Sequence, residues 1–505
     1  MKKRLTAFLL CLLLTLIPAV TAGCSDSKVN SEEGGATAET PTADAAQDSA
    51  EEEPEPTATR LVKDRYADTD LGGYVYKVFA IPTDGHFYSQ VAAGINEVYA
   101  EEMNGEIIND AIFNRNALTE ETLNVKIEPV WGGDVGGMRT QLHNEVLAGG
   151  TEYDATINRM DYLGTNMQNG DLLNIKNIAT IDTSDFWWDK NIVDSFTLFG
   201  TKLYWISGDL NIYDDFAAEV IFFNKQLCAD NGMEYPYETV LDGKWTIDRF
   251  YEMAKTAEKD LDGDGKLAPK TDVVGHCEEN DHVKHWMYAM GEKAMDIGED
   301  GSLTIRIQEE RQIRAVDKLY SIMVEQGMTY TGSSTEFKAG HILFLGTMLG
   351  PIGGLRDMEY EFGVLPMPKL DEEQEHYGEY ISNGWCTAYG IPMTNPDPAR
   401  TGIILDAICG FSNETLRVAL YDVLFGAKFV RDEESVRMLD IIFESKMYDW
   451  AVDFTWGGSF QNLYNGIYNE SHTSTNNFVS QTAKVMKVIN KGLEKLVKSV
   501  SELDY

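Results

Sequence analysis

The sequence predicts an α/β fold with a mostly parallel sheet, because β-rich runs and helical stretches alternate near the start of the folded part. A glycine turn leads into the β-rich run of residues 71–79, the first predicted strand. Residues 125–130 alternate apolar and polar side chains, and residues 153–157 read as a third strand. Helices are expected between these strands, one with Asn109 as its N-cap and one over residues 139–148. This order of elements is typical of an α/β lobe.

The C-terminal part is more helical and shows two apolar stripes. Their residues recur at intervals of three and four, as they do on one side of an amphipathic helix. The stripes consist of Val436, Leu439, Phe443 and Met447, and of Val485, Ile489, Leu493, Leu496 and Val500. The folded part would hold roughly 445 residues, too many for one core, which indicates at least two lobes.

The N-terminus predicts an export signal over residues 1–23. Three basic residues precede an apolar run of about 16 residues, shorter than the roughly 20 that a membrane-spanning helix needs. The run ends in Thr21-Ala22-Gly23-Cys24, which resembles the lipobox of bacterial lipoproteins, although Thr21 stands where Leu is usual. Cys24 is therefore the predicted lipidation site. The alternative is an ordinary signal peptide followed by an incidental cysteine.

The segment after this cysteine, residues 24–61, predicts a disordered acidic linker. It is rich in Ser, Thr, Ala and acidic residues and contains the acidic proline tract of residues 51–56. With almost no large apolar side chain, it cannot bury enough surface to offset the entropy of ordering. We interpret it as a stalk, and the alternative is a processed propeptide.

The net charge of −40 argues against two classes of partner, nucleic acids and anionic lipid surfaces. Nucleic-acid binding needs clustered basic residues, which this composition does not favour. Adsorption to anionic lipid is disfavoured for the same reason, so membrane association is expected to come from the anchor.

The cysteines carry no recognisable metal pattern. Four lie in the expected folded part, without a CxxC pair: Cys228, Cys277, Cys386 and Cys409. They could form a bridge in an exported protein, and we expect them to be free and buried.

An aspartate-rich loop predicts a structural calcium site. Carboxylates at alternate positions followed by glycine suit a hard cation that prefers oxygen ligands. The predicted ligand loop contains Asp260, Asp262, Asp264, Lys266 and Asp272, in a spacing slightly longer than a regular EF-hand. A hydrophilic Asp-Gly turn is the alternative. No other cofactor is expected.

Catalytic motifs are weak, so the chain is not expected to be an enzyme. The sequence contains no GxSxG, HExxH or phosphate-binding glycine loop. His276, His282 and His285 do not match a known zinc spacing.

Aromatic residues beside Gly, Asp and Asn favour a carbohydrate site instead, because a flat ring suits the C–H face of a sugar. They are Trp187, Trp188, Tyr204, Trp205, Tyr213, Trp385 and Trp456. For any one of them alone, packing in the core or between the lobes is the simpler explanation, and it is the set as a whole that favours a carbohydrate cleft.

Four ordered segments resemble family 1 extracellular solute-binding proteins, the sugar-capturing components of ABC importers. The first runs through VIFFNKQL at 220–227 to KWTIDRF at 244–250. The others are FKAGHILF at 337–344, FGVLPMPK at 362–369 and GWCTAYGIP at 384–392. Residues 345–348 depart from the family because they lack its usual aromatic residue.

The resemblance implies a periplasmic-binding-protein-like fold of type II, with two lobes, each a mixed sheet flanked by helices, and a hinge between them. The first lobe would comprise residues 62–213 and 364–413, and the second would comprise residues 214–363 and 414–505. Strand-end loops would line the cleft. The implied ligand-binding residues are Asp84, His86, Asn158, Arg159, Asp161, Asp209, Asn211, Trp385 and Trp456.

The resemblance further implies a monomeric, lipid-anchored protein on the extracellular face of a Gram-positive type of cell membrane. It would capture a carbohydrate, in particular an oligosaccharide, and deliver it to ABC permease subunits. A peptide-binding transport protein, a secreted carbohydrate-active enzyme and a surface adhesin or sensor partner are the alternatives.

Overall fold

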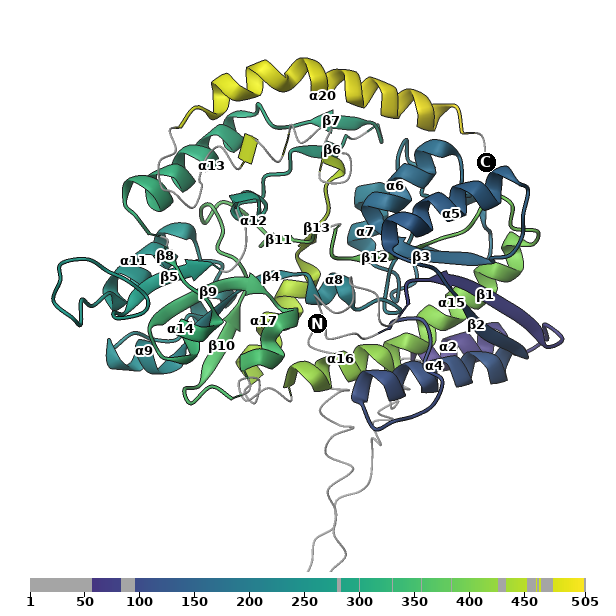
Figure 1. Cartoon of the computed structure of the whole chain (residues 1–505), viewed down its shortest axis with the longest axis horizontal. Helices are drawn as coiled ribbons and strands as arrows, with labels where there is room; N and C mark the ends of the chain where they lie inside the picture. Colours follow the sequence, from purple (N-terminus) through teal and green to yellow (C-terminus); the bar gives the residue numbers. More distant parts are fainter. Residues whose placement is uncertain are drawn as a thin grey trace, which may run out of the picture. The chain divides into compact units, whose positions relative to one another are not determined.

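The computed structural model describes most of the chain from Thr57 onward, within a unit that begins at Pro56. The described residues are 57–82, 96–278, 283–298, 300–328, 330–355, 357–382, 384–425, 433–451, 460, 463–464 and 476–503. They form two lobes, each built on its own mixed sheet flanked by helices (Figure 1). The predicted fold class is therefore confirmed. No helix among these residues combines the length and the apolar character needed to cross a membrane.

The first lobe is built on a sheet with the strand order β12-β3-β1-β2. Its strands are β1 (Tyr74–Ala80), β2 (Val125–Trp131), β3 (Ala155–Arg159) and β12 (Thr387–Gly390). β1 pairs in parallel with both β2 and β3, whereas β12 runs antiparallel to β3. The flanking helices are α2 (Ala58–Arg65), α4 (Ile107–Leu123), α5 (Val135–Leu147), α6 (Met160–Asn169), α15 (Pro398–Glu414) and α16 (Leu416–Phe425).

The second lobe is built on the order β10-β4-β9-β5-β8. Its strands are β4 (Glu219–Asn224), β5 (Val274–Glu278), β8 (Tyr330–Thr331), β9 (Ile342–Met348) and β10 (Phe362–Leu365). Its helices are α9 (Lys225–Asp230), α10 (Tyr237–Leu241), α11 (Ile247–Ala257), α12 (Val283–Ala289), α13 (Glu310–Tyr320), α14 (Ser334–Lys338) and α17 (Glu433–Glu444). Two small pairs complete it: β6 (Met295–Ile297) with β7 (Leu303–Ile305), and β11 (Glu379–Tyr380) with β13 (Lys446–Met447).

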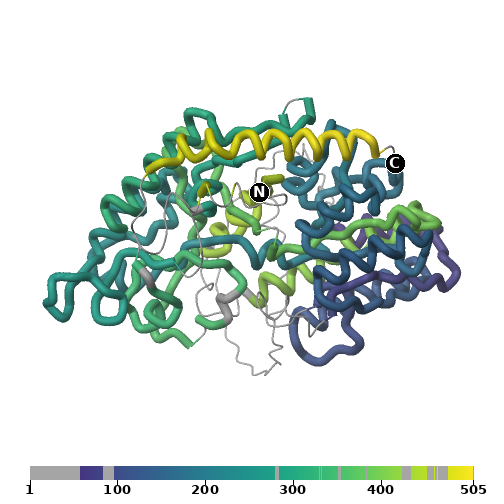
Figure 2. Tube along the Cα trace, turned by 45° about the horizontal axis from the view of Figure 1, so that its top comes forward, coloured from purple at the N-terminus to yellow at the C-terminus, as the bar shows by residue number. Residues whose placement is uncertain are grey.

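Shorter elements and one long helix connect these parts. The short ones are α7 (Lys190–Phe196), α8 (Tyr213–Phe216), the 3-10 turns Ile175–Asn177 and Gly350–Leu355, and the π-helical turn Ser321–Glu325. The long helix is α20 (Phe478–Ser501), which contacts α6 of the first lobe and α13 of the second (Figure 2).

The chain crosses between the lobes along two neighbouring segments that run in opposite directions. Ile206 bridges Tyr389 on the first-lobe side, and Ala218 bridges Ile381 on the second-lobe side. The return crossing begins after Leu365, because Phe362–Leu365 still pairs with β4. The predicted boundary at residue 364 is therefore wrong.

The boundary at residues 413 and 414 is also too early. The helix that follows it, α16, packs against α4 of the first lobe, whereas α17 packs against β10. The chain therefore changes lobe after Phe425 and before Glu433.

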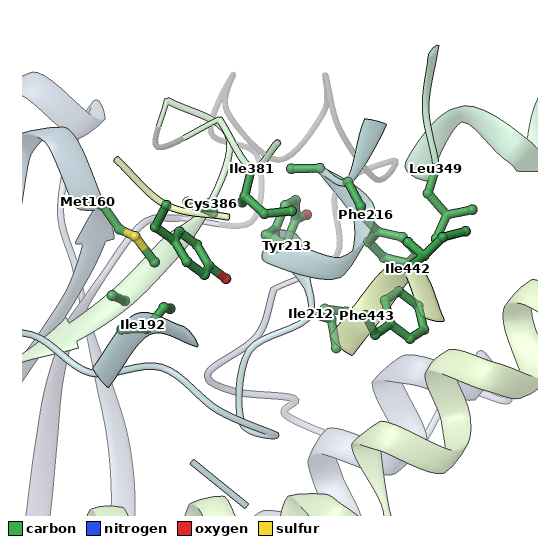
Figure 3. Close-up of a cluster of buried hydrophobic side chains, with 14 of the residues drawn as sticks. Met160, Ile192, Ile212, Tyr213, Phe216, Leu349, Ile381, Cys386, Ile442 and Phe443 are labelled. Carbon is green, nitrogen blue, oxygen red and sulfur yellow. The ribbon is translucent and has the colours of Figure 1, made fainter. Parts of the chain in front are cut away.

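Apolar side chains fill the space around the crossing segments. Figure 3 shows Tyr213 and Phe216 of α8 between Met160 on one side and Leu349 and Ile442 on the other. All five residues are buried, with at most 3% of their surface exposed. The crossing is therefore part of one continuous core.

The folded part begins a few residues earlier than expected. Thr57 caps α2 by accepting a hydrogen bond from Arg60 N at 3.3 Å, and Ala58 and Val62 are buried. Val62 packs against Gly410 of α15 so closely that only a glycine fits there, because a Cβ at position 410 would lie 2.3 Å from Val62 Cγ2. Residues 58–61 therefore belong to the first lobe and not to the predicted linker of residues 24–61.

Most predicted elements are confirmed, with two corrections. Asn109 does not cap its helix, because α4 already begins at Ile107, and Asp110 Oδ1 accepts from the backbone N–H groups of Asn104 and Gly105. Met447 lies in β13 and not in a helix, since α17 ends at Glu444. The four cysteines of the folded part are free and buried, as expected.

Candidate functional site

The candidate site lies at the carboxyl end of β3, at the edge of the first-lobe sheet. Ligands of open α/β sheets bind beyond the carboxyl ends of the strands. Because β12 is antiparallel to β3 and pairs Thr387 with Arg159, the residues that precede β12 reach the same edge. The structure thereby brings Arg159 and Asp161 close to the segment that carries Trp385. The predicted residues Asp84 and His86, which follow β1, lie outside the described residues.

Arg159 and Asp161 form a fixed, partly exposed ion pair at this edge. The guanidinium donates from Nε to Oδ1 at 3.0 Å and from Nη2 to Oδ2 at 2.6 Å. It also lies 4.8 Å from the centre of the Tyr162 ring. Burial raises the pKa of Asp161, and the charge of Arg159 opposes this effect. About a quarter of each side chain remains exposed (25% and 23%), so the pair can offer donors and acceptors to a ligand.

A glycine allows the returning segment to approach this pair closely. A Cβ on Gly384 would lie 3.1 Å from Arg159 Nη2 and 3.6 Å from Ser382 Oγ. Trp385 N and Cys386 N both donate to Ser382 O, at 2.8 and 3.1 Å, and fix the turn. Trp385, the next residue, packs against the core and is half-buried.

Trp131 is an aromatic residue at the same edge that the sequence analysis missed. It is the last residue of β2, is paired in register with Ala80, and is 43% exposed. Because β2 is parallel to β1 and β3, its carboxyl end points in the same direction as theirs. The signal was present in the sequence, since a tryptophan directly follows the second predicted strand.

Two of the predicted ligand residues are buried and use their side chains in internal hydrogen bonds. Asn158 donates to Val135 O at 3.1 Å and accepts from Arg159 N at 2.8 Å. Asn211 accepts from Ser207 Oγ at 2.9 Å and donates to Thr387 Oγ1 at 3.1 Å. Each is only 2% exposed, so we withdraw both from the candidate site.

Asp209, a third predicted ligand residue, belongs to a buried ion cluster at the crossing. Asn413 Nδ2 donates to it at 2.6 Å, and Arg417 Nε lies 4.0 Å away. Burial raises the pKa of Asp209 to about 6. We call this group the crossover ion cluster, and it consists of Asp189, Asp209, Asp214, Asp215, Arg417 and Lys446.

The crossover ion cluster holds four carboxyl groups and two cations. Lys446 Nζ lies 2.6 Å from Asp214, 2.8 Å from Asp189 and 3.1 Å from Asp215. Arg417 Nη1 lies 2.7 Å from Asp215 Oδ2. Burial raises the pKa of Asp214 to about 7. No local pattern predicts this cluster, because Lys446 lies more than 230 residues from Asp214 and Asp215 in the sequence.

In the second lobe, a group of charged and aromatic side chains lies at the beginning of β4. Glu219 begins β4, and its Oε2 lies 3.5 Å from His285 Nδ1 of α12. The His285 ring lies 4.7 Å from the Tyr380 ring, and Lys284 Nζ lies 5.2 Å from the centre of the same ring. Since Tyr380 is two residues before Ser382, this group joins the edge around Arg159 along the chain.

Glu278 ends β5 and is held as a buried acid. Trp286 Nε1 donates to its carboxyl group, and His276 Nε2 lies 3.7 Å from it. Burial raises the pKa of Glu278 to about 8 and lowers that of His276 to about 3. At neutral pH both groups are therefore uncharged.

Most of the aromatic residues proposed for the site lie in the core. Trp187, Trp188, Tyr204, Trp205 and Tyr213 are at most 4% exposed. The polar partner of Trp187 is Asp406 on α15, which accepts a hydrogen bond from Trp187 Nε1 at 3.1 Å inside the core. Trp456 lies outside the described residues, so Trp385 is the one that remains.

The aspartate-rich loop brings three carboxylates together. Ligand atoms of Asp260, Asp262 and Asp264 lie within 4.8 Å of one another and are exposed. These oxygen donors suit a calcium ion. Lys266 and Asp272 do not join them: Lys266 N donates to Asp264 Oδ1 at 2.8 Å.

Asp272 instead fixes the loop backbone. Its oxygens accept from Leu261 N at 2.8 Å and from Ala268 N at 2.9 Å. These hydrogen bonds lower its pKa. Its predicted role as a metal ligand is therefore replaced by a role in the turn.

A separate hollow of about 810 Å³ lies on the second lobe. Charged side chains such as Arg249, Arg314 and Asp371 line it. None of its lining residues belongs to the edge around Arg159, so it is not part of the candidate site.

No family model matches the sequence, and no curated protein matches it. Solved structures do share its architecture. A cyclo/maltodextrin-binding protein complexed with maltotetraose has a TM-score of 0.52 at 16% identity, over 86% of this chain and 98% of that one. UspC from M. tuberculosis has a TM-score of 0.53 at 13% identity, over 84% and 100%.

A sugar transporter from Rhizobium etli, solved in an open conformation, has a TM-score of 0.52 at 12% identity, over 85% and 100% of the two chains. At these identities the likeness concerns the fold. The chain therefore has the two-lobed fold of these proteins, which is the fold that the resemblance implied.

Proposed function

We propose that this chain is the extracellular substrate-binding lipoprotein of an ABC importer and captures a carbohydrate, in particular an oligosaccharide, without transforming it. The observation that carries the proposal is the sheet edge where the Gly384-Trp385 segment approaches the ion pair of Arg159 and Asp161, on a fold shared with a cyclo/maltodextrin-binding protein. A permease of the cell membrane would receive the bound sugar.

The chemistry of this edge suits a sugar. An aromatic face covers the C–H face of a pyranose ring, and a fixed bidentate ion pair offers directed donors and acceptors to its hydroxyl groups. Trp131 would extend the aromatic surface. On the second lobe, Lys284 would contribute to the binding surface, and a ligand that touches both lobes favours their closure.

The N-terminal prediction supplies the location. Removal of residues 1–23 and lipidation of Cys24 would hold the chain at the extracellular face of the membrane as a monomer. We further propose that the loop with Asp260, Asp262 and Asp264 binds a structural calcium ion.

Thermal-shift screening against oligosaccharides tests the function, because a ligand that binds only the folded state raises the melting temperature. We expect at least one oligosaccharide to stabilise the protein and to be recovered intact. Arg159→Ala and Trp385→Ala should each reduce the shift. Phe186→Ala, a change at a 46% exposed aromatic residue elsewhere, should keep it. Consumption of the sugar would establish an enzyme, and stabilisation by peptides alone would establish a peptide-binding protein.

A further inference from the structure

The outward side of α20 carries a row of five lysines, which we call the lysine face. It consists of Lys484, Lys487, Lys491, Lys495 and Lys498. Their spacing of three or four residues places them on one side of the helix. All five are exposed, whereas Ile489, Leu496 and Val500 on the other side are buried. Figure 2 shows α20 at the periphery of the described unit.

This face reverses the charge balance of the chain. The sequence has 82 acidic residues and 42 basic ones, so an ordinary solvated helix face would be rich in acids. Between Phe478 and Ser501 there is one acid, Glu494. The lysine face is therefore a local region of positive potential on an acidic protein.

The lysines are not neutralised by close partners. Lys498 lies 3.8 Å from Glu502, and both side chains are largely exposed. In the described part of the chain, Lys487, Lys491 and Lys495 form no ion pair within 4 Å.

Basic residues of the neighbouring α13 behave differently. Arg311 lies 2.7 Å from Glu292, and Arg314 lies 2.8 Å from Asp371. Of these two neighbouring helices, α20 is therefore the one whose basic side chains remain largely without acidic partners.

We propose that the lysine face binds the anionic headgroups of a lipid bilayer. Lys484 and Lys498 are 14 residues apart, a distance of about 21 Å along the helix. A straight row on a convex helix suits a flat surface of repeated negative charges better than one small anion, which needs converging donors. Val488, 52% exposed, lies at helical spacing within the same face and can enter the headgroup region.

The net charge of the chain does not prevent this contact. At physiological ionic strength, exposed charges farther than about 8 Å from the surface are largely screened. Only the side that touches the bilayer then matters, and each lysine near an anionic surface contributes about 1 kcal/mol, a factor of about five. The expectation that anionic lipid is avoided therefore does not hold for this side.

The contact would orient the folded part relative to the membrane. A long flexible stalk alone leaves every side of the protein free to face the lipid. A basic patch together with an acyl chain gives a stable and directed attachment. This consequence rests on the proposed anchor at Cys24, whereas the binding itself does not.

Vesicle co-sedimentation of the mature chain, with Cys24→Ser to prevent acylation, tests the proposal. We expect binding to vesicles with 30% phosphatidylglycerol, little binding to pure phosphatidylcholine, and release at high salt. The triple variant Lys487→Gln, Lys491→Gln, Lys495→Gln should lower the partition coefficient about 100-fold, because glutamine keeps the helix and removes three charges.

A matched triple variant at Lys126, Lys190 and Lys244, also changed to Gln, removes the same charge from exposed sites elsewhere. It should bind like the unchanged chain. Equal binding of the two triple variants, or no preference for the anionic vesicles, would overturn the proposal. Retention on soluble polyglutamate without vesicle binding would also overturn it. Because the α20 variant should keep its sugar-induced thermal shift, failure of either proposal can be recognised separately.

Discussion

Replacing Lys446 with methionine tests whether the crossover ion cluster holds the lobes together. Methionine matches the length of the lysine stem but removes the charge that faces Asp189, Asp214 and Asp215. Asp215 keeps its contact with Arg417, whereas Asp189 and Asp214 lose their cation. Removing one partner of a buried ion pair typically costs about 3–5 kcal/mol.

The loss of folding stability caused by Lys446→Met should depend on pH. Burial raises the pKa of Asp214 to about 7 in the folded protein. Between about pH 4 and pH 7, the Asp214 carboxyl group is therefore protonated in the folded protein and ionised in the unfolded chain. The stability that this group contributes is present below about pH 4 and is lost as the pH rises through about 7. Without Lys446, the ionised form of Asp214 is even less favourable in the folded protein. The Lys446→Met variant should therefore lose more folding stability at pH 8 than at pH 5.

Urea unfolding at both pH values measures this difference. Lys190→Met is the control, because Lys190 forms an exposed pair with Asp194 that contributes about 0.5 kcal/mol or less. Equal losses for the two variants, or a larger loss at pH 5 than at pH 8, would refute the reasoning.

Three further predictions concern separate parts of the chain. Trp385→Ala should weaken sugar binding about tenfold to 100-fold by calorimetry, through the loss of about 1.5–3 kcal/mol of aromatic burial, and unchanged affinity would remove Trp385 from the site. EDTA should lower the melting temperature and Ca²⁺ should restore it, whereas Asp260→Asn should abolish this response. Asp272→Asn should instead lower the melting temperature with or without calcium, because its carboxylate accepts backbone hydrogen bonds. A melting temperature that EDTA does not change would show that the aspartate-rich loop is a turn without a structural calcium ion. Val62→Ala should lower the free energy of unfolding by about 1–3 kcal/mol, measured by chemical unfolding. A change near zero would show that α2 is part of the linker and not of the first lobe.

The first-lobe strands could be predicted because their apolar pattern is local. Residues 71–79, 125–130 and 153–157 each contain one of the three parallel strands of the mixed first-lobe sheet, and the apolar stripe ending at Val500 lies on α20. Stripes of this kind report burial directly, since one side of each element faces the core.

Long-range contacts explain what could not be predicted. Met447 continues the spacing of α17, yet Lys446 beside it pairs with carboxylates more than 230 residues away, and the chain there forms a strand. Trp187 stands near polar residues in sequence, but its partner Asp406 lies on α15 inside the core. Neighbours in the sequence did not indicate which aromatic side chains remain exposed.

In the proposed capture of a ligand between the two lobes, α20 would constrain how the lobes move. Its C-terminal end is held to the first lobe by Lys202, whose Nζ donates to Val500 O at 2.9 Å. Just before its other end, Asn476 donates to Asp317 of α13 at 2.6 Å. A rod of 24 residues, about 36 Å long, cannot follow two bodies that rotate apart. Opening of the lobes would therefore detach one end of α20 from its lobe. The apolar surface exposed to water at that end would contribute to the free-energy difference between the open and closed states.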